Sequence, residues 1–155
     1  MPEESASIYA GLIMPSAWYP LKEAFLIPIE QMGVLFYDSV EEAAVESGKH
    51  SAESSLKGIY KIFVKVLSPS YVIKRGTNVF SSYYKPAKIK AESTSKHTAK
   101  ITVHNFKKEE ITIIHRISGW IKRAAEITGA TNIETKISES DLDGETVFII
   151  DVNWQ

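Results

Sequence analysis

The chain has 155 residues, of which 44% are hydrophobic and 24% charged, and its formal net charge is −1. These proportions are typical of an ordinary globular domain and exclude a fibre, a repeat array or a charged tail. The absence of cysteine excludes disulfide frameworks, thiolate nucleophiles and cysteine zinc sites. The first residues are acidic, and the apolar stretch at residues 8–13 is too short for a signal peptide or a membrane span. We therefore expect a cytoplasmic protein without a membrane partner.

Charge is distributed unevenly along the chain. Residues 1–48 contain one lysine and eight acidic residues, whereas residues 49–90 contain nine basic residues and one acidic residue. Such blocks either neutralise each other within one domain or leave a basic face for an anionic partner. Because the two blocks are of similar size, we expect mutual neutralisation.

The N-terminal segment is predicted to begin with a strand and continue with a helix. The apolar run at residues 8–13 predicts a short strand. A helix is predicted from Leu21, and Pro28 should kink or split it, because proline removes one backbone hydrogen bond and clashes with the preceding turn.

Two helices are predicted next. Ser39 and Glu42 form a capping box, which predicts a short acidic helix that ends at Gly48. Ser51 then opens the most clearly patterned helix of the chain. Its apolar side chains recur at a spacing of three and four residues: Leu56, Ile59, Tyr60, Phe63, Val66 and Leu67.

A further helix and a hairpin are predicted beyond this point. Ser68 is a candidate N-cap, with Pro69 at the first helical position, for a helix that residues 76–78 could interrupt. The hydrophobic period then changes from about 3.6 to 2. Residues 101–104 and 111–113 alternate in polarity and predict a strand hairpin.

The C-terminal region predicts one more helix and two strands. An amphipathic helix covers residues 117–129, and strands cover residues 133–137 and 147–154. An Asp-Gly pair at residues 143–144 suits the turn between these strands. We therefore predict an α+β fold, in which an N-terminal helical layer packs on a C-terminal antiparallel sheet with one crossing helix, in a ββαββ-like order.

We expect one domain over residues 1–155. Its first part, residues 1–85, should be mainly helical, and its second part, residues 86–155, should carry the sheet. No linker composition and no internal repeat divides the chain.

Catalytic and metal-binding signatures are missing, so we expect neither an enzyme nor a metal site. The four histidines form no close pair on a predicted helix. His115 is the most interesting of them, because it lies beside Arg116 where a predicted strand meets a helix and could titrate near neutral pH. A less favoured hypothesis is an enzyme with His115 as general base and Tyr84 as acid.

A basic ridge is predicted on the helix that follows Ser51. Lys57, Lys61 and Lys65 are four residues apart and lie opposite the apolar stripe. With Arg75 they could bind an acidic protein, which is the alternative function that we keep open. A solvated helix face is the simplest explanation, and nucleic acid fits less well because interleaved aromatic residues are missing.

Two glycines lie within well-patterned helices, on the side away from the apolar stripe. Gly58 and Gly119 each cost about 1 kcal/mol relative to alanine at such positions. Close packing of a helix, a ligand or a second subunit would explain them, and so would a neutral accident.

Large aromatic side chains are numerous for a domain of this size. Tyr83 and Tyr84, at the junction of helix and sheet, could line an apolar cavity together with Trp120 on the crossing helix. Tyr60 and His115 complete the predicted ligand-binding set, and the expected ligand is small and largely apolar.

Several of these segments resemble a known protein family. They are residues 54–60, 67–69, 81–84, 119–121 and 152–154. The chain resembles, over about residues 18–155, an uncharacterised bacterial family that is abundant in myxobacteria. It is more distantly similar to 4-vinyl reductase and haem nitric-oxide-binding domains. The resemblance implies a helical half followed by an antiparallel sheet, and it implies a small-molecule-binding module.

The haem-binding relatives imply a gas sensor, but their haem residues are missing here. In those relatives a histidine lies on the helix that precedes the sheet, and a Tyr-x-Ser-x-Arg motif binds the propionates. Residues 51–96 contain no histidine, and the best local match, residues 104–109, lacks the tyrosine, serine and arginine. We therefore expect no cofactor and no haem.

The leading hypothesis is a non-catalytic sensory or signalling module that binds a small apolar ligand between its helical and sheet layers. No output domain is recognisable in the sequence, so we expect it to signal by association, as a homodimer or with a protein partner.

Overall fold

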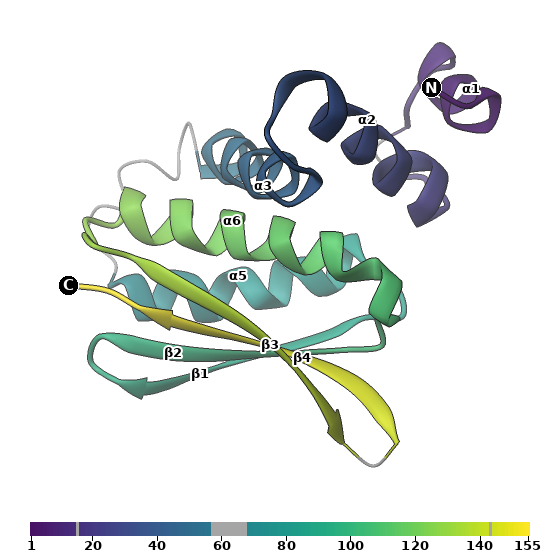
Figure 1. Ribbon diagram of the computed structural model, residues 1–155. Helices are drawn as coiled ribbons and strands as arrows, with labels where there is room; N and C mark the ends of the chain where they lie inside the picture. The colour runs from purple at the N-terminus through teal and green to yellow at the C-terminus, as the bar shows by residue number, and fades with distance from the viewer. Residues whose placement is uncertain (15, 57–67, 143) are drawn as a thin grey trace.

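The computed structural model describes residues 1–14, 16–56, 68–142 and 144–155. A sheet lies at the base, helices α5 and α6 cover one of its faces, and helices α1 to α3 lie beyond α6 (Figure 1). The helices are α1 (Glu3–Ala10), the π-helical segment η1 (Lys22–Leu26), α2 (Ile27–Phe36), α3 (Val40–Leu56), α5 (Pro69–Tyr83), the short turn η2 (Lys108–Glu110) and α6 (Ile111–Ile127). The strands are β1 (Lys88–Ser95), β2 (Thr98–His104), β3 (Glu134–Leu142) and β4 (Glu145–Asn153).

The sheet is antiparallel, with the strand order β1-β2-β4-β3. Ile101 of β2 lies opposite Ile150 of β4, and Val103 lies opposite Ile89 of β1. These side chains are buried because their face of the sheet packs under α5 and α6, while their neighbours along each strand are mostly polar. Since α6 crosses between the two hairpins, the predicted ββαββ order and α+β class are confirmed.

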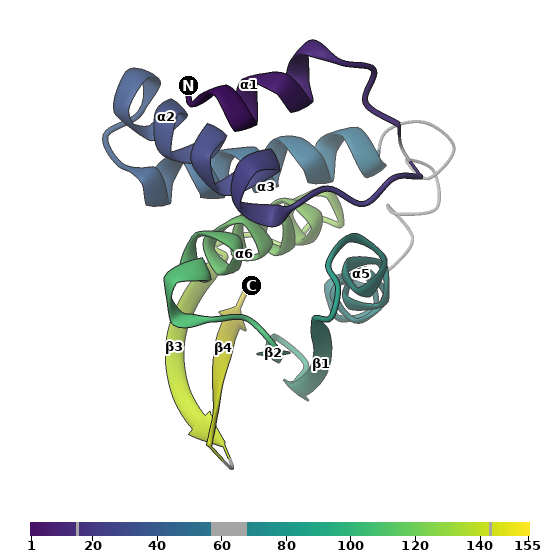
Figure 2. The same cartoon turned by 90° about the vertical axis from the view of Figure 1, so that its right-hand side faces the viewer.

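Helix α6 lies between two layers, with the sheet on one side and α3 on the other (Figure 2). Gly48 of α3 and Gly119 of α6 bring the two helix backbones into direct contact. A Cβ atom on Gly48 would overlap the carbonyl oxygen of Arg116, and one on Gly119 would overlap the carbonyl oxygen of Val45. The close approach predicted for Gly119 is therefore that of a second helix, and Gly58 lies outside the described residues.

Several predicted boundaries are confirmed. Pro28 lies in the first turn of α2, and the preceding chain is π-helical, so proline does divide this segment. Ser39 Oγ accepts a hydrogen bond from the Glu42 N–H at 3.0 Å, as the capping box predicts. Ser68 Oγ caps α5 in the same way. The turn before β4 contains Gly144 at φ 81°, which glycine adopts without strain.

Several predictions about elements are wrong. Residues 8–13 do not form a strand, since α1 continues to Ala10; Glu3 and Glu4 lie in its first turn, where carboxylates stabilise a helix N-terminus. The helix predicted to end at Gly48 continues to Leu56, because this glycine serves helix packing rather than termination. Ser51 is thus inside α3, and residues 57–67 lie outside the described part of the chain.

The predicted hairpin is also different. Residues 111–113 begin α6, because the Glu110 carboxylate accepts a hydrogen bond from the Lys107 N–H at 2.8 Å and starts the helix there. The partner of β2 is instead β1, which the sequence analysis missed. In addition, α5 runs through residues 76–78 without interruption. Within the described ranges no helix is long and apolar enough to cross a membrane.

Candidate functional site

A polar cluster around Arg116 lies where the N-terminal helices meet α6 and the end of α5. Arg116 Nη1 donates to the hydroxyl of Tyr84 at 2.5 Å, and Nη2 donates to Ser51 Oγ at 3.2 Å. The guanidinium carbon lies 5.0 Å from the ring centre of Phe25, in a cation–π contact. We call Arg116, Tyr84, Ser51 and Phe25 the Arg116 cluster.

The glycine contact between α3 and α6 positions this cluster. Ser51 follows Gly48 by three residues, so it lies on the same face of α3, towards α6. Tyr84 is the C-cap of α5, and its backbone N–H donates to the Phe80 carbonyl at 3.1 Å. Phe25 comes from η1, and π-helical turns occur frequently at functional sites. Four elements that are distant in sequence therefore meet at one guanidinium.

The Arg116 cluster has more donors than acceptors. A guanidinium carries five N–H groups. Arg116 Nε is buried and has no hydrogen-bond partner within the described ranges, and no carboxylate of those ranges pairs with this side chain. The Tyr84 and Ser51 oxygens accept from Arg116, and no acceptor for their hydroxyl hydrogens lies within the described residues. Burial raises the pKa of Tyr84 despite the nearby guanidinium, so the phenol keeps its proton at neutral pH.

His115 and Tyr84, the predicted base and acid, have different partners. His115 Nδ1 lies 3.4 Å from a carboxylate oxygen of Glu41, whereas the Tyr84 phenol is bonded to Arg116. Burial lowers the pKa of His115, and the attraction of Glu41 opposes this only weakly because that carboxylate is largely exposed to water. Within the part of the chain that the structure describes, these two side chains therefore have no common partner.

Two of the aromatic side chains predicted to line a cavity, Trp120 and Tyr84, pack against phenylalanine rings instead. Trp120 meets Phe80 edge-on with ring centres 5.0 Å apart, and a Cβ on Gly76 would lie only 2.5 Å from the Trp120 ring. Tyr84 packs edge-on against Phe106 at 5.7 Å. The space between α5, α6 and the sheet is thus occupied by these rings and by the buried isoleucines of the core.

Of the other predicted site residues, those that the structure describes are not brought to this cluster. Tyr83 is 60% exposed at the end of α5, and Arg75 is exposed on the same helix. Tyr60 and the three lysines of the predicted ridge, Lys57, Lys61 and Lys65, lie outside the described residues. Their roles in binding a ligand or a partner therefore stay predictions.

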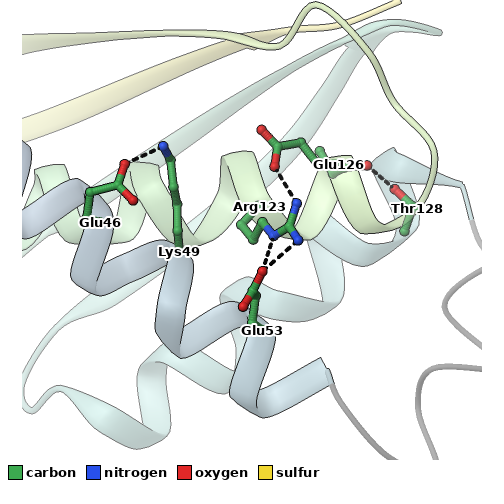
Figure 3. A network of polar contacts seen from close by, with 7 residues as sticks. Glu46, Lys49, Glu53, Arg123, Glu126 and Thr128 are labelled. Atoms are coloured by element: carbon green, nitrogen blue, oxygen red, sulfur yellow. Dashed lines mark hydrogen bonds and ion pairs between the residues drawn. The ribbon is translucent and has the colours of Figure 1, made fainter.

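A surface groove of about 520 Å³ lies along α3 and α6. Arg123 on its wall donates to Glu53 at 2.6 and 2.9 Å and to Glu126 at 2.8 Å, and Lys49 pairs with Glu46 (Figure 3). These charges are already paired with one another and are partly exposed, so the network joins two helices rather than presenting an unsatisfied group. It contrasts with Arg116, whose donors exceed its acceptors.

Sequence reasoning noted Arg116 only as the neighbour of His115. A usable signal was present, because this arginine lies within the buried stretch of α6, between Ile114 and Ile117, three residues before Gly119. A charged side chain at such a position needs partners from another element. The groove along α3 and α6 was missed as well, because its lining residues come from three segments that are separate in sequence.

The residues present do not fit a haem group of the kind that the resemblance implies. Helix α5, which precedes the sheet, contains no histidine. His50 and His97 are exposed, His104 ends β2, and His115 lies against Glu41. The Trp120 ring also packs directly against Gly76, so it occupies the space between α5 and α6 at this point.

Comparison with solved structures shows the same fold in the H-NOX family. A structure determined to probe heme distortion in that family superposes with a TM-score of 0.71 at 13% identity, over 97% of this chain and 84% of that chain. An oxygen-binding H-NOX domain related to soluble guanylate cyclases gives 0.70 at 13% identity, over 99% and 83%. An Fe(II) unliganded H-NOX mutant from K. algicida gives 0.64 at 14% identity, over 99% and 86%.

No protein-family model matches the sequence, and no curated protein matches it. The predicted relation to haem nitric-oxide-binding domains is confirmed at the level of the fold, and the links to myxobacteria and to 4-vinyl reductases stay predictions. Nearly the whole length of the chain has the H-NOX fold.

Proposed function

We propose that the protein is a non-catalytic sensory module that binds a small, largely apolar molecule, without haem, at the Arg116 cluster. The observation that carries this proposal is the buried Nε of Arg116, which has no hydrogen-bond partner among the described residues, inside an H-NOX-like fold. One structural neighbour is an oxygen-binding domain, so this fold can serve ligand recognition. The proposed site lies on the N-terminal side of α6, because the space between α5, α6 and the sheet is packed.

The position of the cluster suggests how a ligand would act. The contacts of the N-terminal segment with the rest of the protein include two cation–π pairs, Phe25 with Arg116 at 5.0 Å and Trp18 with Lys85 at 4.3 Å. A ligand bound to Arg116 would compete with Phe25 for the guanidinium. It would thereby change how η1 and α2 lie on α3 and α6, and we propose that a protein partner or a second copy of the chain reads this change.

Thermal unfolding of the purified protein tests the proposal. The probes are indole, indole-3-acetate, decanol and decanoate, each added to the full chain. A ligand at 100 times its Kd stabilises the folded state by about 2.7 kcal/mol, so at least one probe should raise the Tm measurably. Native mass spectrometry should also detect any small molecule that copurifies.

A variant with a charge change elsewhere on α6 provides the control. Arg116→Gln should lose the stabilisation, and Lys122→Gln, which removes one positive charge from the same helix, should keep it. If no probe changes the Tm and nothing copurifies, the sensory proposal is rejected.

A further inference from the structure

We infer that the ligand of this site is an organic acid whose carboxylate is bound by Arg116 with the hydroxyls of Tyr84 and Ser51. This inference rests on the proposed function and specifies the chemical class of its ligand. Its basis is the donor count of the Arg116 cluster: the buried Nε has no acceptor in the described part of the chain, and both hydroxyl oxygens already accept from the guanidinium. The group that is missing must accept several hydrogen bonds, and a carboxylate has two oxygens that do so.

The charge of the Arg116 cluster favours a ligand with one negative charge. The cluster contains one cation, and within the described ranges no carboxylate compensates it. Partial burial makes an uncompensated charge costly, and a single carboxylate neutralises it. A phosphate that carries two negative charges would leave an excess negative charge in the same place. A guanidinium edge also matches the two oxygens of a carboxylate in a planar fork.

The side chains around the Arg116 cluster favour an acid that is apolar apart from its carboxylate. The Phe25 ring covers the guanidinium, and Phe106 packs on the Tyr84 ring at 5.7 Å. Leu21, Leu26 and Phe25 itself pack against the main core from the N-terminal side. A ligand that displaces Phe25 from the guanidinium would therefore meet apolar side chains around its carboxylate. The class is a small aromatic or aliphatic carboxylic acid.

The test compares acids with their neutral amides. The probes are indole-3-acetate against indole-3-acetamide and decanoate against decanamide, titrated into the full chain. Binding is followed by calorimetry and by the Nε–Hε cross-peak of Arg116 in a ¹H–¹⁵N NMR spectrum, which is assigned by its loss in Arg116→Lys. At least one acid should bind ten or more times more tightly than its amide and should move this cross-peak.

Substitutions separate the carboxylate contact from general effects. Arg116→Gln should weaken binding of the acid at least tenfold, bringing it close to the amide, while Lys122→Gln should leave the acid-to-amide ratio unchanged. Tyr84→Phe and Ser51→Ala each remove one hydroxyl donor and should weaken the acid several-fold. They keep the inference testable if Arg116→Gln does not fold.

The outcomes distinguish this inference from the proposed function. Equal affinity for acid and amide, or acid binding that leaves the Arg116 cross-peak unmoved, overturns the carboxylate assignment and leaves the sensory module standing. Binding of no probe of either kind overturns both.

Discussion

The α3–α6–sheet region and the N-terminal segment before α3 are built very differently. In the first, side chains such as Ile101, Phe148 and Ile150 are fully buried, and two helices touch through glycines. In the second, large apolar side chains are exposed, among them Leu12 at 84% and Phe36 at 75%. The comparison teaches that closely packed elements carry Arg116, while the segment that covers it with Phe25 leaves more of its apolar side chains exposed and should open at lower free energy.

The largest expected effect comes from matched truncations in the two regions. Phe148→Ala should lower the free energy of unfolding by about 3–5 kcal/mol, because it opens a cavity in the fully buried core. Phe36→Ala removes the same atoms from an exposed position and should change stability by less than about 0.5 kcal/mol. Urea unfolding of both variants measures the difference, and similar losses would contradict the contrast between the regions.

A second pair of substitutions compares the glycines. Gly119→Ala should destabilise the protein by about 1–3 kcal/mol or more, because its methyl group meets the carbonyl oxygen of Val45, a backbone atom that moves only if the whole of α3 shifts. Gly11 follows α1, and the atoms nearest to a Cβ placed there lie 3.8 Å away. Gly11→Ala should therefore be neutral or slightly stabilising.

Calorimetric unfolding is the measurement for this pair. A Gly119→Ala protein as stable as the Gly11→Ala protein would mean that α3 and α6 do not touch as described. In that case Ser51 would also lose the reason for its position beside Arg116.

The same division into regions explains what the sequence could predict. In the second half, β2, α6, β3 and β4 were predictable because hydrophobic period and turn residues act locally there, as the alternation of Ile101 and Val103 and the turn at Gly144 show, whereas β1 was missed. The error at Gly48 arose because a glycine that ends one helix and a glycine that packs against another look alike in sequence. Only the position of α6 in space distinguishes them.

The candidate site was less predictable than the fold. Tyr84 was identified from its place at the helix–sheet junction, and it does join the Arg116 cluster. Phe25 and Ser51 were not identified, since they are 91 and 65 residues from Arg116 and carry no motif. Trp120 was predicted to face a cavity, but the absence of a side chain at Gly76 lets α5 fill that space. Such arrangements depend on tertiary contacts that no local pattern encodes.

The smallest expected effect is a pH dependence at His115, on the face of α6 that meets α3. Burial lowers the pKa of this imidazole in the folded state, so the unfolded chain binds a proton more readily. Stability should therefore be unaffected by this group above its ordinary pKa of about 6.5 and should decline as the pH falls below that value.

Urea unfolding between pH 8 and pH 5 should show a shallower decline in His115→Gln than in the native chain. Glu41→Gln should show a steeper one, because it removes the carboxylate that partly favours the imidazolium. Parallel profiles for all three proteins would mean that His115 is as well solvated when folded as when unfolded, and α3 would then cover α6 less completely than the glycine contact requires.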